Sequence, residues 1–459
     1  MIKMIKIDDS VTRGIEEDYV KATKIIIKES IEKFEYNSLN QSYSLKDRKG
    51  NIICDFNNSY KEFIENLLGA KIEQDEESVN LTFNDNGKKI ESITLSDLNK
   101  TIDYFLELFK KEYSFEIKSV LKVNYNMKQV VSKIDKLAIN KTKDEIKKRK
   151  IEIDEFINLY EEFIDDGFLA KYKIKEKNGF SRIITNKEEF KKSFKLKNTY
   201  IEKIKDYKEK NKILKYIFDY KKLCNGVEIA KDVLLDRHEL ISKMGFRTCP
   251  YCNRQYITNY RDKNKKNKTT ADLDHFYSKS EYPFLALSLY NFIPSCQICN
   301  SRFKVADDFY YKKHIYPYKE KFGEDAKFKT SFYTEEDIKD KDKIYDIRYL
   351  LGDSDNFKIE IKPKNPKSEI GTKIQNSIET FHLQDLYNLH KDYVREIIKK
   401  AIIYNESRID ELYTQYPELF SSREEVMQMV VSNYISDEAL GKRPLSKLTK
   451  DICEELGLR

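Results

Sequence analysis

The spacing of apolar residues predicts an N-terminal region in which helices are combined with hairpins. Residues 16–35 place apolar side chains at helical intervals. Residues 42–56 alternate like two short strands around a Lys-Gly-Asn turn, and residues 79–95 repeat that pattern around Asn86-Gly87. Residues 96–113 return to helical spacing. We therefore expect a small α+β domain here, and it contains no motif typical of catalysis.

The middle and the end of the chain follow a mostly helical pattern. Residues 140–243 carry dense charge around apolar positions at helical spacing, which is typical of helices with solvated faces. Residues 226–245 are interpreted as one helix that Gly245 ends. Residues 347–366 suggest a strand pair. From about residue 377 the pattern is helical, with an apolar stripe formed by Leu386, Leu389, Val394, Ile397, Ile398, Ala401 and Ile402.

These patterns predict an α+β protein that is mostly helical and has four consecutive regions. The chain of 459 residues is long enough for several domains. We expect an N-terminal α+β domain (1–125), a charged helical region (126–245), a compact module with four cysteines (246–320) and a C-terminal mainly helical domain (321–459). The chemistry-bearing residues concentrate in the third region.

Composition narrows the classes of function. The 85 basic and 78 acidic side chains give a net charge of +7, which is compatible with a polyanionic partner without being diagnostic of one. No apolar run reaches the length of a membrane span, and the first ten residues lack the apolar core of a signal peptide. We therefore expect no membrane association and a cytoplasmic location. Neither of the glycine-rich phosphate-binding motifs occurs, so ATP binding by this chain is not expected.

Four of the seven cysteines form two Cys-x-x-Cys pairs, Cys249 with Cys252 and Cys296 with Cys299. Two such pairs supply the thiolates of a closed tetrahedral zinc site, and their doubled spacing argues against coincidence. The 43 residues between the pairs (253–295) exceed the ~15–20 of a compact zinc ribbon, so an element is expected to fold between them. Because no coordination position is left open, this Zn²⁺ would be structural.

The segment between the pairs carries groups suited to phosphodiester chemistry. Residues 253–275 predict a hairpin, and the second cysteine pair can open a helix. Asp274 is a hard oxygen ligand for Mg²⁺, while a neutral His275 can take a proton from an attacking water. Asn300 directly follows the last thiolate and is a candidate second oxygen ligand. Asn291 suits a structural task, in which its amide bridges loop backbone groups.

Residues Asp274 to Lys304, DHFYSKSEYPFLALSLYNFIPSCQICNSRFK, resemble the HNH endonucleases, the ββα-metal nuclease family. The family pattern combines an Asp-His pair, an Asn before an apolar-Pro stretch, and a C-x-x-C-N-x-x-x-K segment. The resemblance implies a zinc-stapled ββα-metal HNH nuclease module between an N-terminal α+β domain and a C-terminal helical domain. It also implies that His275 is the general base, that Asp274 and Asn300 hold a single Mg²⁺ or Mn²⁺, and that Asn291 orients the base. The last family ligand is often His, so Asn300 leaves the metal preference open.

Residues 282–300, together with the helical tail at 381–401, more loosely resemble the HNH nucleases of bacterial anti-phage systems of the Septu type. This resemblance implies an antiviral defence role and a separate ATPase or sensor subunit as partner. The implied activity is hydrolysis of DNA, with His275 activating the water in line with the scissile phosphate. An RNA-cleaving toxin and a catalytically inactive, zinc-dependent nucleic-acid-binding subunit are the alternatives.

Phosphate contacts are expected from cations near the motif, with Lys279, Arg302 and Lys304 as the first candidates. The Lys-rich loop at 263–268 is equally compatible with a flexible hairpin tip and with a loop that grips the backbone. Further cations nearby are Arg247, Arg254, Arg261, Lys263, Lys265, Lys266 and Lys268. Outside the motif, structural roles are expected for His238, His314, His382, His390, Tyr310, Tyr311, Tyr316 and Tyr318.

Overall fold

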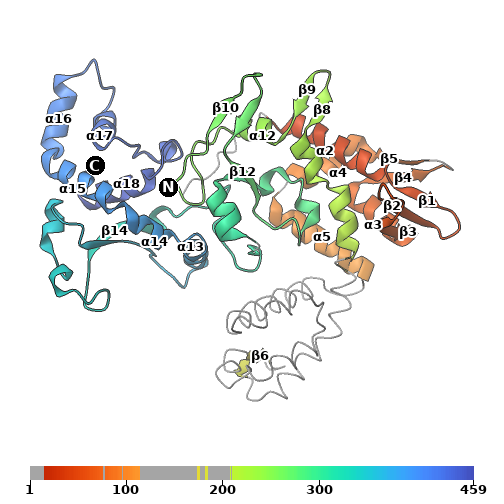
Figure 1. Cartoon of the computed structure of the whole chain (residues 1–459), viewed down its shortest axis with the longest axis horizontal. Coiled ribbons are helices and arrows are strands. Elements are labelled where there is room, and N and C mark those ends of the chain that lie inside the picture. The colour runs from red at the N-terminus through yellow and green to blue at the C-terminus, as the bar shows by residue number, and fades with distance from the viewer. Residues whose placement is uncertain are drawn as a thin grey trace. The chain divides into compact units, whose positions relative to one another are not determined.

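A computed structural model gives the structure of the chain (Figure 1). The residues that it describes are 15–75, 78–95, 97–113, 173–175, 181–183, 207, 209–305 and 307–458. The chain groups into two compact units, each made of segments that are separated in sequence. The units are Met1–Tyr36 with Leu68–Leu98 and Lys215–Arg459, and Asn37–Leu67 with Asn99–Leu214. The four consecutive regions expected from the sequence stay a prediction.

Helix α2 (Glu16–Ile31) confirms most of the first predicted helix. Acidic side chains fill its first turn, where the partial positive charge of a helix N-terminus favours them. One face is buried, and it packs against helix α4 (Lys88–Leu95) and strand β8 (Val227–Ala230) of the same unit. A short strand β1 (Glu35–Asn37) then follows, so the last predicted helical residues are wrong.

The first predicted hairpin is confirmed and the second is wrong. Strand β2 (Ser42–Lys46) pairs antiparallel with β3 (Ile52–Asn57), and Gly50 takes a positive φ of 83° in the turn. In contrast, β5 (Val79–Phe83) pairs with the strand before it, β4 (Ala70–Gln74). The residues after β5 form helix α4, so the Asn-Gly turn leads out of a strand into a helix.

The reason for the second error is visible in the sequence around Asn86-Gly87. Asp85 and Asn86 both adopt positive φ, which ends the strand with a tight turn. After it, Ile90 and Ile93 are buried and lie three residues apart, a helical interval that the strong Asn-Gly signal concealed. Thr94 confirms the helical geometry by donating from its hydroxyl to the Ile90 carbonyl over 2.7 Å.

Helix α5 (Leu98–Tyr113) agrees with the predicted helix over 96–113, and helix α3 (Asn58–Leu68) precedes it. Most of the predicted charged helical region at 126–245 lies outside the described residues. Within that region, the short strands β6 (Lys173–Lys175) and β7 (Ser181–Ile183) pair with each other.

The single helix predicted for residues 226–245 is wrong in its first half. After helix α11 (Tyr220–Asn225), strands β8 and β9 (Val233–Leu235) form a hairpin. The alternation of Val and Leu in this stretch suits strands as well as a helix, and Asp232 at a φ of 63° closes the turn. Helix α12 (Arg237–Met244) then begins at Asp236, whose carboxylate accepts from the Glu239 amide over 2.7 Å. It ends at Gly245 as predicted, in the left-handed conformation.

The cysteine-rich segment folds as two strand pairs and one short helix. Strands β10 (Asn259–Arg261) and β11 (Asn267–Thr269) form a hairpin within the stretch where one was expected, but the run at 271–276, expected as its second strand, does not take part in it. Strand β12 (Asp272–His275) instead pairs antiparallel with β13 (Phe292–Ser295), which places Asp274 opposite Ile293. The short π-type helix η5 (Ile298–Lys304) follows directly, so a ββα order is present. The turns η3 (Pro283–Leu285) and η4 (Leu289–Asn291) connect the two strands.

The C-terminal part combines one long hairpin with helices. Strand β15 (Phe357–Pro363) pairs with β14 (Ala326–Phe332), whereas residues 347–351 form the turn η8. Only one of the two strands expected within 347–366 therefore forms, and it pairs with a strand that lies earlier in the chain. Helix formation begins earlier than predicted, at Glu369. The helices are α13 (Glu369–Thr380), α14 (Leu383–Tyr387), α15 (Lys391–Ile403), α16 (Glu406–Gln415), α17 (Arg423–Val431) and α18 (Ser446–Glu455).

The predicted apolar stripe of this region is only partly buried. Val394, Ile397 and Ile398 lie in the core, whereas Leu389 and Ile402 are exposed. Helix α18 packs on strand β14. It contains a fully buried ion pair between Lys447 and Asp451, and the backbone amide of Phe328 in β14 donates a hydrogen bond to the Asp451 carboxylate. Within the described ranges, no helix combines the length and the apolar character needed to cross a bilayer.

Candidate metal centre and adjoining pocket

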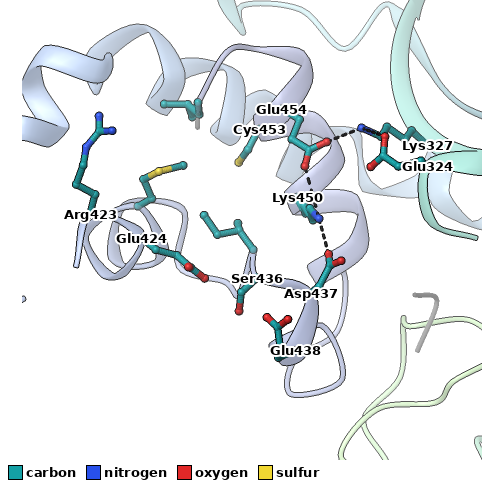
Figure 2. A pocket seen from close by; sticks show the side chains of 13 residues that line it. Glu324, Lys327, Arg423, Glu424, Ser436, Asp437, Glu438, Lys450, Cys453 and Glu454 are labelled. Atoms are coloured by element: carbon teal, nitrogen blue, oxygen red, sulfur yellow. Dashed lines mark hydrogen bonds and ion pairs between the residues drawn. The ribbon is translucent and has the colours of Figure 1, made fainter. Parts of the chain in front are cut away.

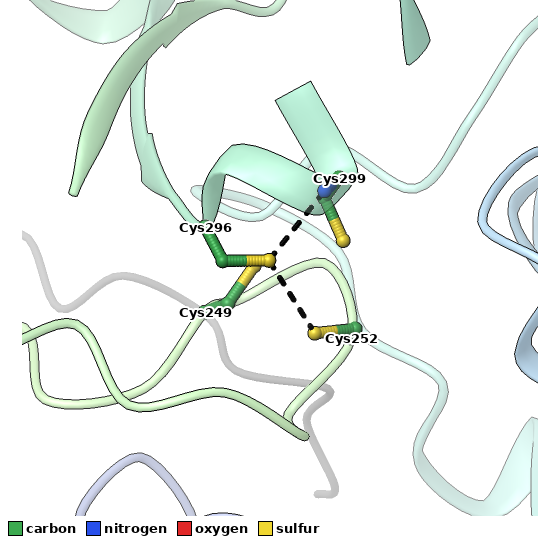
Figure 3. A group of neighbouring side chains, drawn as sticks. All are labelled: Cys249, Cys252, Cys296 and Cys299. Atoms are coloured by element: carbon green, nitrogen blue, oxygen red, sulfur yellow. Dashed lines mark hydrogen bonds between the residues drawn. The ribbon is translucent and has the colours of Figure 1, made fainter. Parts of the chain in front are cut away.

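The four cysteines converge on one point, as Figure 3 shows. Cys249 and Cys252 lie on a loop, while Cys296 and Cys299 lie at the end of β13 and the start of η5. All four sulfur atoms are within 4.8 Å of one another, and all four residues are buried. A Zn–S bond of ~2.3 Å requires sulfur atoms about 3.8 Å apart in a tetrahedron. The Cys252 and Cys296 sulfurs are 4.0 Å apart, so the cluster fits a structural metal such as Zn²⁺.

Only a cation would allow all four cysteines of the cluster to be ionised. Burial raises the pKa of the Cys249 thiol, and hydrogen bonds with the neighbouring thiols raise that of Cys299. The same neighbours lower the pKa of Cys296, since it accepts their hydrogen bonds. Four buried sulfurs therefore cannot all become thiolates unless a metal ion balances their charge.

The C-terminal segment holds the first cysteine pair in place. Asn253 adopts a positive φ of 47° after Cys252, and its side-chain oxygen accepts from the Lys447 amide and the Ser446 hydroxyl, each over 3.1 Å. Asn253 thereby caps helix α18, whose own N-cap residue, Leu445, makes no side-chain capping bond. In addition, the Tyr387 hydroxyl donates to the Cys252 carbonyl over 2.7 Å.

Asn291 ties together the loop between β12 and β13. Its side-chain oxygen accepts from the Tyr277 amide over 2.8 Å, and its amide nitrogen donates to the Tyr277 and Leu285 carbonyls over 3.0 and 3.1 Å. The residue is fully buried. Three bonds of this kind fix the loop next to His275, which is the kind of structural task expected for an amide at this position.

His275 is a buried imidazole with a defined orientation. Its Nε2 lies 3.1 Å from the Ala286 carbonyl, and its ring meets the ring of Tyr220 edge-on at 4.6 Å. A carbonyl oxygen accepts only, so a neutral His275 carries its proton on Nε2. No described residue bonds to Nδ1. Burial lowers the pKa of His275 well below its usual value, aided by the nearby Lys279 ammonium. The ring is therefore neutral, with Nδ1 as an acceptor.

Among the described contacts, no hydrogen bond joins Asp274 to Asn300, with which the sequence paired it. Both Asp274 carboxylate oxygens accept from the Lys304 ammonium over 2.8 Å, and the Tyr251 hydroxyl donates to the same carboxylate over 2.6 Å. Both members of this ion pair are buried, and the ammonium also bonds to the His275 carbonyl. Burial lowers the pKa of Lys304, and the Asp274 carboxylate opposes that shift.

Asn300 contacts a different acid, Asp272. Its amide nitrogen lies 3.1 Å from the Asp272 carboxylate, and the Ser301 hydroxyl lies 3.4 Å from the same oxygen. Asp272 and Asn300 are both half-buried. Residues two apart in a strand share a face, so Asp272 and Asp274 both face η5 and meet residues one turn apart on it.

These residues line a cavity of about 480 Å³ at the end of the β12–β13 pair. Asp274, His275 and Asn300 all border it, so the structure brings three of the predicted site residues together. Asn291 lies behind the pocket wall. The cavity is also lined by Tyr220, Arg237, Asp272, Leu273, Ser278, Lys279, Ser280, Ser301, Lys304, Val305 and Asp307.

Several of these lining residues were not expected from the sequence, and Asp272, Tyr220 and Arg237 are the ones that matter for the chemistry of the pocket. Asp272 had a usable signal, because it lies two residues before Asp274 in a predicted strand and therefore on the same face. Tyr220 and Arg237 come from α11 and α12, and no local pattern marks them as neighbours of the motif. Beyond the motif itself, the pocket thus gains two acidic groups, Asp272 and Asp307, and one cationic group, Arg237.

The predicted phosphate contacts divide into three groups. Lys279 lines the pocket with its ammonium 4.0 Å from the centre of the Tyr220 ring, and Lys304 lines it while paired with Asp274. Arg302 is exposed and does not border the pocket. Arg254 is engaged elsewhere, since it donates to His390 over 3.1 Å. The remaining candidate cations also do not line this pocket; they are Arg247, Arg261, Lys263, Lys265, Lys266 and Lys268.

The other histidines and tyrosines make packing contacts. His314 is buried, stacks on Phe309 at 3.7 Å, and pairs with the Thr380 hydroxyl over 2.9 Å. The hydroxyls of Tyr316 and Tyr318 donate to backbone carbonyls over 2.8 Å. These partners agree with the structural roles expected for them.

A larger cavity of about 630 Å³ lies among the C-terminal helices (Figure 2). Both of its lysines are engaged in ion pairs: Lys450 pairs with Asp437 and Glu454, and Lys327 pairs with Glu454 and Glu324. Neither a histidine nor any of the four clustered cysteines lines it. The smaller pocket beside the cysteines is therefore the candidate site.

Comparison of the chain with family models, with curated proteins and with solved structures found no match. The class of protein therefore rests on the described geometry: a mixed α+β protein with a buried four-cysteine cluster that could hold a structural metal, next to a polar pocket.

Proposed function

We propose that the chain is a metal-dependent endonuclease that hydrolyses DNA phosphodiester bonds in the pocket beside the cysteine cluster. One observation carries this proposal: a neutral, buried His275, whose Nδ1 has no hydrogen-bond partner among the described residues, borders a cavity that is also lined by three carboxylates and Asn300. The other buried histidine, His314, uses both of its ring nitrogens. The ββα order and the resemblance to the HNH nucleases support the same activity.

In the proposed reaction, His275 accepts the proton of the attacking water at Nδ1. The bond from Nε2 to Ala286 holds the tautomer that leaves Nδ1 free, and Asn291 fixes the loop on which Ala286 lies. A hard divalent ion such as Mg²⁺ or Mn²⁺, held by carboxylate and amide oxygens of the pocket, would stabilise the charge that develops on the phosphate and the leaving oxygen.

Cationic side chains position the polymer. Lys279 and Arg237 border the pocket from two sides and provide positive charge for the phosphates that flank the scissile bond. Lys304 contributes less directly, because its ammonium is already bonded to Asp274. A defence role, a partner ATPase or sensor subunit, and RNA as substrate stay predictions that rest on the family resemblance.

Cleavage of supercoiled plasmid DNA and of a labelled single-stranded RNA, each with Mg²⁺ or Mn²⁺, tests the proposal. We expect His275→Ala to lose about 10²–10⁴-fold of the wild-type rate while it retains zinc and secondary structure. The exposed His382 provides a matched control, and His382→Asn suits its positive φ of 49°. Wild-type rates in His275→Ala, or no cleavage of either polymer by the zinc-loaded wild type, contradict the proposal. Cleavage of RNA but not of DNA would identify RNA as the substrate in place of DNA.

A further inference from the structure

We infer that Asp272 and Asn300 form the ligand pair for the divalent ion, and that Asp274 is a positioning residue. The inference rests on the proposed metal-dependent nuclease and assigns its ligands differently from the sequence motif, which points to the acid directly before His275. It follows from how the two acids of β12 are partnered. Each acid contacts a different residue of η5. The partner of Asp274 is a cation, Lys304, whereas the partner of Asp272 is a neutral amide, Asn300.

The carboxylate of Asp274 already accepts three hydrogen bonds. Both of its oxygens accept from the Lys304 ammonium, and Tyr251 supplies a further donor. Asp274 and Lys304 are only 5% and 4% exposed. A divalent ion bound at Asp274 would therefore either lie next to a buried positive charge or displace it without another partner to receive it. Both outcomes are unfavourable, because a buried charge needs a compensating partner.

The carboxylate of Asp272 is available by comparison. Among the described residues its hydrogen-bond donors are the Asn300 amide at 3.1 Å and the Ser301 hydroxyl at 3.4 Å, and both contact the same oxygen. A half-rotation of the Asn300 amide exchanges its nitrogen for its oxygen, which would place two oxygens from different elements at one point. The half-buried setting also leaves room for the water ligands that Mg²⁺ retains.

The Asp274–Lys304 pair supports the histidine. The Lys304 ammonium reaches the His275 carbonyl as well as the Asp274 carboxylate, so it joins η5 to the end of β12. This contact fixes the backbone that carries the imidazole. Asp274 therefore acts through Lys304 and His275, whereas Asp272 and Asn300 would touch the ion directly.

Binding of Mn²⁺ to the zinc-loaded full chain, followed by electron paramagnetic resonance, separates the two assignments without measuring cleavage. We expect Asp272→Asn and Asn300→Ala each to raise the Kd for Mn²⁺ by at least about tenfold while zinc content and thermal unfolding stay unchanged. Asp274→Asn leaves Lys304 without its partner, so its stability is expected to fall. The double variant Asp274→Asn/Lys304→Met removes both charges and is expected to bind Mn²⁺ within about threefold of the wild type.

Two results would overturn the inference. The first is loss of Mn²⁺ binding in the folded double variant, and the second is wild-type binding in Asp272→Asn. In either case the cleavage assay still decides whether the chain is a nuclease. Conversely, Mn²⁺ binding that depends on Asp272 in a protein that cleaves neither polymer would uphold the ligand pair and contradict the proposed activity.

Discussion

The cysteine cluster and the adjoining pocket share one short segment, yet they differ in the groups that line them and in their openness to solvent. In the cluster, four buried sulfurs of one kind surround a point and leave no space for another ligand. In the pocket, oxygen and nitrogen groups of several kinds border a cavity of about 480 Å³ that water can enter. Closed coordination suits a structural ion, whereas an open polar cavity suits an ion that must meet a substrate. Helix η5 joins the two, because Cys299 and Asn300 are consecutive.

The two buried histidines show the same contrast on a smaller scale. His314 pairs with the Lys312 carbonyl and the Thr380 hydroxyl, and it stacks on Phe309, so its ring is satisfied on every side. His275 borders the pocket and uses only one ring nitrogen, since no hydrogen bond from the described residues reaches Nδ1. A group that the fold satisfies completely stabilises structure, and a group that the fold leaves partly unsatisfied is available for chemistry.

The largest expected effect comes from breaking the cluster. Cys299→Ser should lose zinc and unfold the β12–β13–η5 segment, because metal binding of this kind contributes on the order of 10 kcal/mol. Metal analysis together with limited proteolysis measures both consequences. Cys224→Ser, outside the cluster, is the matched control and should retain zinc. A Cys299→Ser protein that lacks zinc and unfolds like the wild type would show that the cluster is not the structural anchor.

Next in size is the buried ion pair on which the pocket is built. Lys304→Met leaves the Asp274 carboxylate buried without its cation, so the free energy of unfolding should fall by about 3–5 kcal/mol. Urea denaturation of the zinc-loaded protein measures this. Adding Asp274→Asn removes the remaining charge and should recover most of the loss. If Lys304→Met were as stable as the wild type, the ion pair would contribute no more than an exposed one, and the contrast between the buried Asp274 and the half-buried Asp272 would lose its basis.

A smaller effect is expected where the pocket meets a polyanion. Arg237→Ala and Lys279→Ala should weaken binding of a labelled DNA duplex, and each should reduce the slope of log K against log salt concentration by about 1. Arg302→Ala is the control, since this exposed residue does not border the pocket. Fluorescence anisotropy across a salt series makes the comparison. Equal losses in all three variants would indicate diffuse attraction and no preferred path across the pocket.

The smallest effect concerns His314, whose pKa burial lowers to about 3. Unfolded histidine titrates near 6.5, roughly its ordinary pKa, so between these values the unfolded chain binds the extra proton. The free energy of unfolding should therefore decrease as the pH falls below about 6.5, by at most about 1.4 kcal/mol per pH unit from this residue. Denaturation of His314→Gln between pH 7 and 5 should show a flatter dependence than the wild type. His382→Asn serves as control, and a slope unchanged in His314→Gln would contradict the assignment.

Local signals in the sequence predicted much of the fold and of the site. The spacing of the two cysteine pairs predicted the buried cluster, and helical spacing predicted α2, α5 and the end of α12 at Gly245. Turn residues predicted the β2–β3 hairpin, and the polar loop after residue 261 predicted the tip of the β10–β11 hairpin but not its second strand. The same signals failed where two readings fit one stretch. Residues 227–235 suited a helix as well as the hairpin that forms, and the Asn-Gly signal obscured helix α4.

What the sequence determined by itself is a set of groups and their approximate elements: four thiols that can share a metal, an Asp-His pair on a strand, and Asn300 on the helix after it. Only the tertiary structure decided the partners. It paired Asp274 with Lys304 and Asp272 with Asn300, brought Tyr220 and Arg237 to the pocket, and used Asn253 to cap α18. Turn chemistry and apolar spacing act over a few residues, whereas the choice between two acids on one strand face depends on register and packing against a separate element.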